Sequence, residues 1–145
     1  MKKLFSYSIA FLVVCLSLSC EEGKDCCVPP PGIEGQITGS WLLFERGYSP
    51  GSGYITEPVS ENPAQTLTFR SNGQLISTVS GQEDFKYYFV DVDQKVVAFY
   101  KQDPGPTPDP STYTTSYDFS FEEYNLRLNF RYCIEGCHME LRKVN

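Results

Sequence analysis

The chain has few of the residues that catalytic and nucleic-acid-binding sites need. It contains a single histidine, His138, and its 12 Lys and Arg residues are outnumbered by 18 Asp and Glu, which gives a formal net charge of −6. A nucleic-acid-binding protein needs a basic patch, so this charge excludes that class of partner. No acid is placed to orient His138 for catalysis, and no glycine-rich loop could hold a phosphate. We therefore expect neither enzyme activity nor a cofactor or metal.

Strong helix formers are also scarce. The only alanines after residue 20 are Ala64 and Ala98, whereas the chain holds ten Tyr and ten Phe. Aromatic and β-branched residues favour strands. Apolar and polar residues alternate with a period of two between short turn segments, which predicts strands and not helices. The eight expected strands cover residues 39–46, 65–70, 74–80, 84–91, 95–101, 112–121, 125–133 and 137–144.

The segments between these strands indicate how they connect. Ser71-Asn72-Gly73 contains Asn-Gly, a strong signal for a tight hairpin. Residues 48–63 are rich in Gly, Ser and Pro, and residues 103–110 hold four prolines, so we expect two long exposed loops. Sequential antiparallel strands with one apolar face must bury that face, and eight of them can close a small barrel. The predicted fold is all-β: an eight-stranded antiparallel up-and-down meander closed into a barrel over 39–145.

The N-terminus has the layout of a secretory signal. Two lysines precede an apolar run over 4–18, which is short for a membrane span of about 20 residues. Ser19-Cys20 follows, and a Cys directly after a small residue resembles the lipobox of bacterial lipoproteins. That resemblance implies a signal peptide over 1–19 and a lipidated Cys20, which would attach the protein firmly to a membrane. The alternative is a plain secreted protein whose Cys20 forms a disulfide.

Residues 20–38 read as a tether between the lipid and the barrel. Pro29-Pro30-Pro31-Gly32 is compatible with an extended chain and not with a helix or a central strand. The charged run over 21–25 resembles the surface-export signal of lipoproteins from Bacteroidota-type bacteria. This resemblance implies a cell-envelope location at the outer membrane, either periplasmic or surface-exposed. An acidic, solvated linker is the alternative interpretation.

Four further cysteines predict two disulfides in an exported domain. They are Cys26, Cys27, Cys133 and Cys137. Adjacent cysteines rarely bond to each other, so the favoured pairing joins each of Cys26 and Cys27 to one of Cys133 and Cys137. That pairing would clamp the start of the domain to its last hairpin and leave only 21–25 as free reach from the membrane.

The same cysteines allow two other interpretations. Cys133 and Cys137-His138 resemble a c-type haem site with one residue too many between the cysteines. The four thiolates with His138 could also bind zinc. Adjacent Cys26 and Cys27 give poor tetrahedral geometry, and an oxidising compartment disfavours free thiolates. We therefore expect disulfides, with no haem and no metal. By strand parity, His138 is expected to face solvent.

A second resemblance involves Gly39-Ser40-Trp41 at the start of the first strand. A Gly-x-Trp followed by an eight-stranded meander is similar to the lipocalin-like domains, and most of all to the small ones found in lipoproteins of Bacteroidota-type bacteria. The resemblance implies that Trp41 closes one end of the barrel beneath an arginine from near the C-terminus. Arg142 is the candidate for that arginine, with Arg131 as a substitute. It also implies that the barrel binds a small hydrophobic molecule.

An aromatic stripe could line such a barrel and bind an apolar or aromatic ligand, with Tyr hydroxyls as hydrogen-bonding groups. The candidate lining residues are Trp41, Tyr87, Phe89, Tyr113, Tyr117, Phe119, Phe130 and Tyr132. The alternative is a filled barrel whose aromatics are ordinary core. In that case the loops 48–63 and 103–110 would serve a non-catalytic envelope scaffold or interaction protein. A glycan-binding variant would use Tyr48, Tyr54 or Tyr113. The sequence identifies no protein partner.

Overall fold

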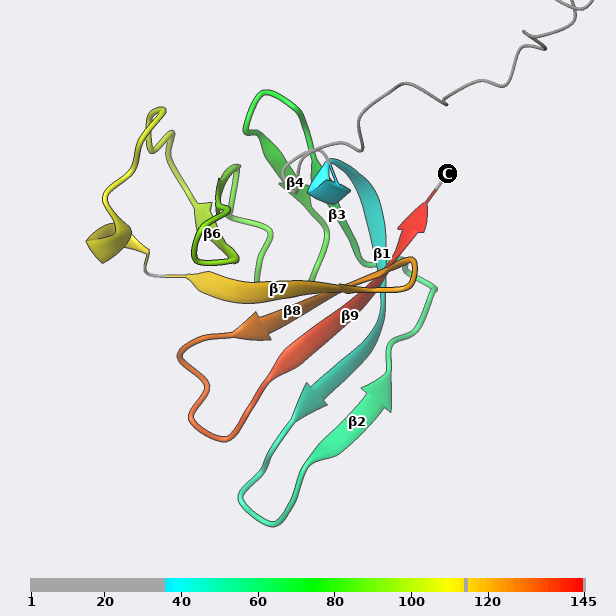
Figure 1. Cartoon of the computed structure of the whole chain (residues 1–145). Helices are drawn as coiled ribbons and strands as arrows, with labels where there is room; N and C mark the ends of the chain where they lie inside the picture. Colours follow the sequence, from blue (N-terminus) through cyan, green and yellow to red (C-terminus); the bar gives the residue numbers. More distant parts are fainter. Residues whose placement is uncertain (1–35, 114, 145) are drawn as a thin grey trace, which may run out of the picture. The chain divides into compact units, whose positions relative to one another are not determined.

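One antiparallel sheet holds nearly all the regular structure of the computed structural model, which describes residues 36–113 and 115–144 (Figure 1). Among these residues, no helix is long and apolar enough to cross a membrane. The short 3-10 helix η1 (Pro110–Thr112) lies in the connection between the sixth and seventh strands. The described residues form nine strands: β1 (Gly39–Tyr48), β2 (Ile55–Pro58), β3 (Thr66–Phe69), β4 (Leu75–Ser77), β5 (Tyr87–Asp91), β6 (Val96–Tyr100), β7 (Ser116–Glu122), β8 (Asn125–Phe130) and β9 (His138–Val144).

The strand order is that of an up-and-down barrel. It runs β4-β3-β1-β9-β8-β7-β6-β5, with β2 off this path and paired with β1. The first strand thus pairs with the last, and apart from β2 the other neighbours follow one another along the chain. The sheet closes nearly completely, with a seam between β4 and β5. A single bridge between Gln74 and Tyr87 spans this seam. Two backbone bonds flank it: Leu75 N–H donates to Lys86 O at 2.8 Å, and Tyr88 N–H to Gly73 O at 2.9 Å. The predicted all-β meander of eight barrel strands is confirmed.

The expected loop over 48–63 is wrong in part, because it contains β2. A register shift between Leu43 and Glu45 marks a bulge in β1. Before the bulge, one edge of β1 pairs with β3; after it, the same edge pairs with β2. The other edge pairs with β9 throughout. Figure 1 shows the β1–β2 hairpin projecting at the same end as the connection between β8 and β9.

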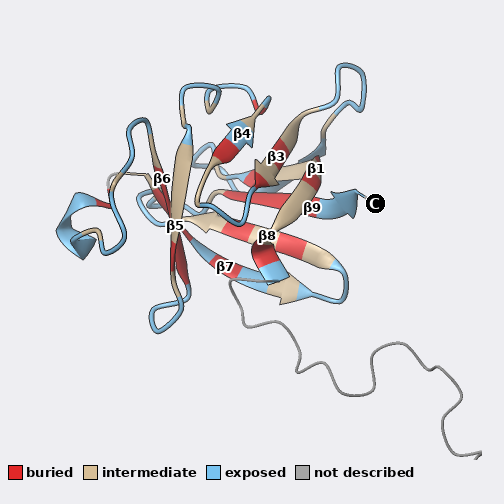
Figure 2. Ribbon diagram, turned by 90° about the horizontal axis from the view of Figure 1, so that it is seen from above, coloured by how far each residue is buried: buried red, intermediate tan, exposed pale blue. Residues whose placement is uncertain are grey.

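The middle of the barrel is occupied by a packed apolar cluster (Figure 2). Members on adjacent strands alternate as predicted: Tyr117 and Phe119 on β7, and Leu126 and Leu128 on β8, all face inward. The rest of the buried cluster is Ile37, Trp41, Leu43, Leu67, Phe69, Leu75, Val79, Val90, Val97, Phe99, Met139 and Leu141. The apolar side chains of the described strands thus pack together in the middle of the barrel, and the pocket described below lies at one end.

The predicted facing of β5 is wrong. Tyr88 and Val90 contribute to the interior cluster, while Phe89 packs in a second cluster outside the barrel. Tyr87 shares the outward face of Phe89, because strand parity places them together. The sequence Tyr-Tyr-Phe-Val over 87–90 is apolar on both faces, so its pattern cannot show which face is inside.

The outer cluster explains why both faces of this region are apolar. Val96 and Ala98 of β6 point outward, and Tyr113 from the connection before β7 covers them with only 4% of its surface exposed. The rings of Tyr113 and Phe89 lie 6.2 Å apart. The expectation that Tyr87, Phe89 and Tyr113 line the interior is therefore corrected: they lie on the outer side of β5 and β6.

Trp41 is buried, but the cation beside it is not the expected one. Its indole Nε1–H donates to Ile37 O at 2.7 Å. Lys143, which is opposite Trp41 in the β1–β9 register, places Nζ 5.3 Å from the ring centroid, within the range of a cation–π interaction. Arg142 instead pairs with Glu61, and Arg131 with Asp118. Arg142 is one residue out of phase with Trp41, so it faces the other side of the sheet.

The disulfide pairing also differs from the favoured one. Cys133 bonds to Cys137 across the turn between β8 and β9. Their Cα atoms are 5.7 Å apart, within the usual range of about 4.4–6.8 Å. The expected clamp to Cys26 and Cys27 is therefore wrong, and so is the short reach from the membrane that depended on it. Cys20, Cys26 and Cys27 lie outside the described residues, so the lipidation of Cys20 stays a prediction.

Candidate functional site

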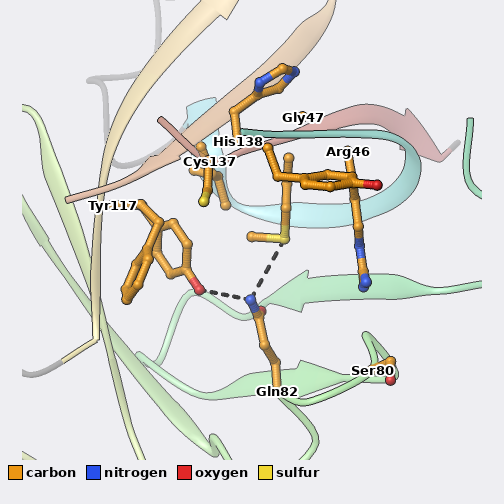
Figure 3. A pocket seen from close by; sticks show the side chains of 11 residues that line it. Arg46, Gly47, Ser80, Gln82, Tyr117, Cys137 and His138 are labelled. Carbon is orange, nitrogen blue, oxygen red and sulfur yellow. Dashed lines mark hydrogen bonds between the residues drawn. The ribbon is translucent and has the colours of Figure 1, made fainter. Parts of the chain in front are cut away.

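A pocket of about 270 Å³ lies at the end of the barrel where β1 ends and β9 begins (Figure 3). Four strands and two connections contribute to it: β1, β7, β8 and β9, the connection between β4 and β5, and the connection between β8 and β9. The lining residues are Arg46, Gly47, Tyr48, Ser80, Gln82, Tyr117, Leu128, Phe130, Cys137, His138 and Met139. We call this the end pocket. Its lining combines apolar side chains that continue into the core with a few polar groups.

Apolar side chains form the inner wall of the end pocket. Leu128 is fully buried, and Tyr117 and Met139 are each 6% exposed. Phe130 packs against them, with its ring 5.4 Å from that of Tyr117. These residues alternate inward along β7, β8 and β9, so the barrel pattern itself creates the wall.

Gln82 supplies the polar centre of the end pocket. Its Nε2–H donates to Tyr117 Oη at 2.7 Å and approaches Met139 Sδ at 3.6 Å, as the dashed lines in Figure 3 show. Its Oε1 is buried and has no hydrogen-bond partner among the residues that the structure describes. Leaving a buried acceptor unpaired costs about 1–3 kcal/mol. A bound molecule with an N–H or O–H group could pair with this oxygen.

Tyr117 keeps its proton at neutral pH. Burial raises the pKa of its hydroxyl to about 12, and the positive charge of Arg46 opposes this shift. The hydroxyl accepts from Gln82 and still has its own proton to donate. The end pocket thus presents a neutral donor beside a neutral acceptor.

Arg46 brings a positive charge to the rim. Its Nη2–H donates to Gln65 Oε1 at 2.8 Å, an uncharged acceptor that also receives Ser80 N–H at 3.0 Å. Figure 3 shows Arg46 on the same side of β1 as Gln82 and Tyr117, while the His138 ring points to the opposite side. Within the described part of the chain, no carboxylate lies within 4.0 Å of the Arg46 guanidinium.

The predicted lining residues are only partly brought together here. Tyr117 and Phe130 line the end pocket, whereas Phe119 and Trp41 lie in the packed core. Tyr132 is 59% exposed, and its hydroxyl donates to Tyr113 O at 2.6 Å outside the barrel.

The sequence pattern missed Arg46, Gln82 and Met139 as pocket residues. Strict alternation from Trp41 would turn Glu45 inward. The bulge shifts the phase, so Arg46 lies opposite inward-facing Met139 instead. Gln82 lies in an irregular connection that has no period to follow, and no sequence signal could have placed it.

His138 is buried, which corrects the expectation of a solvent-facing ring. Only 5% of it is exposed, because Tyr54 from the β1–β2 hairpin stacks on the ring and its hydroxyl bonds to Nδ1. Arg127 Nη2 lies 3.3 Å from the same nitrogen. On the other side, Glu45 Oε1 lies 3.6 Å from Nε2. The ring thus holds the hairpin against the outer face of β9.

Burial and the neighbouring charges together set the protonation state of His138. Burial lowers the pKa of His138, as does the positive charge of Arg127, while Glu45 opposes the shift. Burial raises the pKa of neighbouring Glu140, although Arg127, 3.1 Å away, opposes that rise. His138 is therefore a neutral ring within a mostly buried ionic cluster. Among the described residues, no three His, Cys, Asp or Glu side chains are arranged to hold a metal ion.

A scan against protein-family models gives no match, and searches of curated proteins and of solved structures give no significant match either.

Proposed function

We propose that this protein is a non-catalytic binding protein of the cell envelope, anchored through Cys20, which holds a small ligand in the end pocket. The observation that carries the binding proposal is the buried, unpaired Oε1 of Gln82 beside an apolar wall. A ligand donor would satisfy this oxygen and its apolar body would cover Leu128 and Phe130. The anchoring half rests on the signal-like N-terminus and Ser19-Cys20.

The dimensions of the end pocket restrict the ligand. Its volume of about 270 Å³ is at the lower limit of typical small-molecule sites, about 300–1,000 Å³. The core cluster blocks deeper entry. The ligand is therefore a molecule with one or two rings or a short chain, and a long acyl chain would not fit inside. An N–H or O–H group on the ring would pair with Gln82 Oε1.

Indole derivatives test this proposal, because they combine a small apolar ring with an N–H donor. Indole-3-acetamide and indole-3-acetate are titrated into the purified full chain, and binding is monitored through the amide chemical shifts of the protein. We expect saturable shifts at Gln82, Tyr117 and Met139. Ser80→Trp, which places a large ring at an exposed rim position, should abolish them. Ser52→Trp, an exposed serine outside the end pocket, should leave them unchanged.

Two results would overturn the binding proposal. One is the absence of saturable shifts with either compound. The other is equal binding by wild type and Ser80→Trp, since that would place the indole somewhere else. Anchoring is tested separately on the full chain, as described below, so failure of one half leaves the other intact.

One observation favours a second function, that of an interaction protein. Apolar side chains are exposed at the barrel end where the two hairpins meet: Ile134 is 100% exposed, Tyr132 59% and Tyr54 50%. The hairpins approach each other closely, since a Cβ on Gly136 would lie 3.4 Å from the Tyr54 ring. Retention of every envelope partner by a Tyr54→Ser, Ile134→Ser variant in pull-downs would argue against this function.

A further inference from the structure

Arg46 has an unusual position for a cation in an acidic chain. The chain carries an excess of six acidic residues. Of the four other described arginines, exposed Arg70 donates to Gln74, whereas Arg127, Arg131 and Arg142 each lie within 4.0 Å of a carboxylate. Arg46 does not, although it is half-buried and lines the end pocket. A charge withdrawn from water needs a partner to offset the lost hydration.

The nearest acid in the strand register is already engaged. Glu57 lies opposite Arg46 across the β1–β2 pair, but its carboxylate accepts a hydrogen bond from Tyr48 Oη at 2.8 Å. Gln65, the residue that does accept from Arg46, is neutral and shares the same oxygen with Ser80 N–H. The guanidinium has five N–H donors in a planar fork, so several remain for a bound group.

We propose that the end pocket selects anionic ligands: small aryl carboxylates whose acid group pairs with Arg46 while the ring lies against Leu128 and Phe130. This inference rests on the proposed binding function and adds the charge of the ligand to it. Arginine suits this role because its fork can bind a carboxylate through two parallel hydrogen bonds. The neutral Tyr117 hydroxyl, which feels the positive charge of Arg46, is a second hydrogen-bond donor for the carboxylate of the ligand.

A matched pair of ligands isolates the charge. Indole-3-acetate and indole-3-acetamide have the same ring and nearly the same size, and only the first is an anion at pH 7.5. Each hydrogen bond to a charged group is stronger than a neutral one by an amount that corresponds to about 5- to 10-fold in affinity, and a carboxylate can form two such bonds with the guanidinium. We therefore expect the purified full chain to bind the acetate about 10- to 100-fold more tightly than the acetamide in isothermal titration calorimetry.

Three arginine variants test whether Arg46 causes the preference for the acetate. Arg46→Gln should bring the two affinities within about twofold, chiefly by weakening the acetate. Arg46→Lys keeps the charge without the fork and should retain part of the preference. Arg70→Gln is the matched control, because Arg70 also donates to a glutamine (Gln74 Oε1, 3.2 Å) but is exposed and lies outside the end pocket. It should behave as wild type. Trp41 fluorescence and thermal melting check that each variant is folded.

The outcomes separate this inference from the binding function. Equal affinity of wild type for both indoles, with shifts in the end pocket, would overturn the inference and leave the binding function standing. A preference for the acetate that persists in Arg46→Gln would also overturn it. Failure of both compounds to bind overturns the binding function itself.

Discussion

Replacing Gly47 with alanine should destabilise the protein, although the backbone there suits any residue. Gly47 is buried in β1, opposite His138 on β9. A Cβ at this position would overlap the His138 ring at Cε1 and Nδ1 and would also overlap Tyr54 Oη. Gly47→Ala must therefore displace Tyr54 from His138 or push β1 away from β9.

The magnitude follows from opposing effects. Gly→Ala at a compatible backbone position stabilises by about 0.4–1 kcal/mol, because it restricts the unfolded chain. Forcing atoms into a packed site costs about 1–3 kcal/mol. Loss of the Tyr54–His138 hydrogen bond removes about 0.5–1.5 kcal/mol more. The crowding outweighs the entropic gain, so we expect a net destabilisation of about 1–3 kcal/mol.

A mutant cycle tests the cause of this loss. The free energy of unfolding is measured by urea denaturation at pH 7.5 for Gly47→Ala in wild type and in a Tyr54→Ala, His138→Ala background. Without those two side chains the methyl group meets no crowding, so the same substitution should be neutral or stabilising. The difference between the two backgrounds gives the coupling energy.

Two results would refute this reasoning. A Gly47→Ala protein as stable as wild type would show that Tyr54 does not occupy the space over His138. An equal loss in both backgrounds would place the cost in the backbone of β1 and not in the side chains above it.

Four further predictions follow from the same contacts. Because the pKa of His138 is lowered in the folded state, the unfolded chain binds more protons below about pH 6.5, and the free energy of unfolding should fall as pH drops from there, by at most about 1.4 kcal/mol per pH unit. Glu140 has a raised pKa in the folded state, so above the pKa that it has in the unfolded chain it acts in the opposite direction. The free energy of unfolding is therefore measured by urea denaturation at pH 7.5 and 5.5 for wild type and for His138→Gln, in which the loss of stability at pH 5.5 should be smaller. An unchanged loss of stability in His138→Gln would exclude His138 as its source. Leu128→Ala, at a fully buried position, should cost about 2–5 kcal/mol, and a loss below about 1 kcal/mol on denaturation would mean that the site is not packed. The double variant Cys133→Ser, Cys137→Ser removes a disulfide whose cysteines have a sequence separation of only 4. The chain-entropy model therefore gives a loss of about 2 kcal/mol in the free energy of unfolding, and not the about 4–5 kcal/mol of a disulfide that closes a long loop. A loss of the larger size would point to other contacts. Cys20→Ala should abolish labelling of the full chain by radioactive palmitate and release it from the membrane fraction, while Cys15→Ala should change neither; labelling that persists in Cys20→Ala would contradict lipidation at Cys20.

The strand succession was predictable where one face alone is apolar. On β7 and β8 the alternation is clean, and Asn72-Gly73 places the turn between β3 and β4. Where both faces are covered, as on β5, the pattern carries no information about which face is inside. The outer cover there is Tyr113, more than twenty residues away along the chain. A strand face that is covered by a residue distant in the sequence cannot be recognised from the residues of the strand itself.

The candidate site was harder to predict than the fold. The bulge after Leu43 turns Arg46 inward, and nothing in the local sequence distinguishes it from a regular strand. His138 would be exposed on an isolated sheet, and it is buried only because Tyr54 reaches over it from the β1–β2 hairpin. The sequence favoured pairing of Cys133 and Cys137 with Cys26 and Cys27, whereas the structure joins Cys133 to Cys137 across the turn of the last hairpin.

Because of the seam between β4 and β5, the strands of the barrel should differ in how easily they open locally. β7 and β8 are joined over six register pairs, whereas β4 and β5 share one bridge. The amide protons of Leu75 and Tyr88, which close that seam, should exchange with solvent sooner than those of the β7–β8 ladder. Gln82 lies on the connection between these same two strands. The weakly closed seam of the barrel therefore adjoins the polar centre of the end pocket, and opening there would widen the mouth of the end pocket on the Gln82 side.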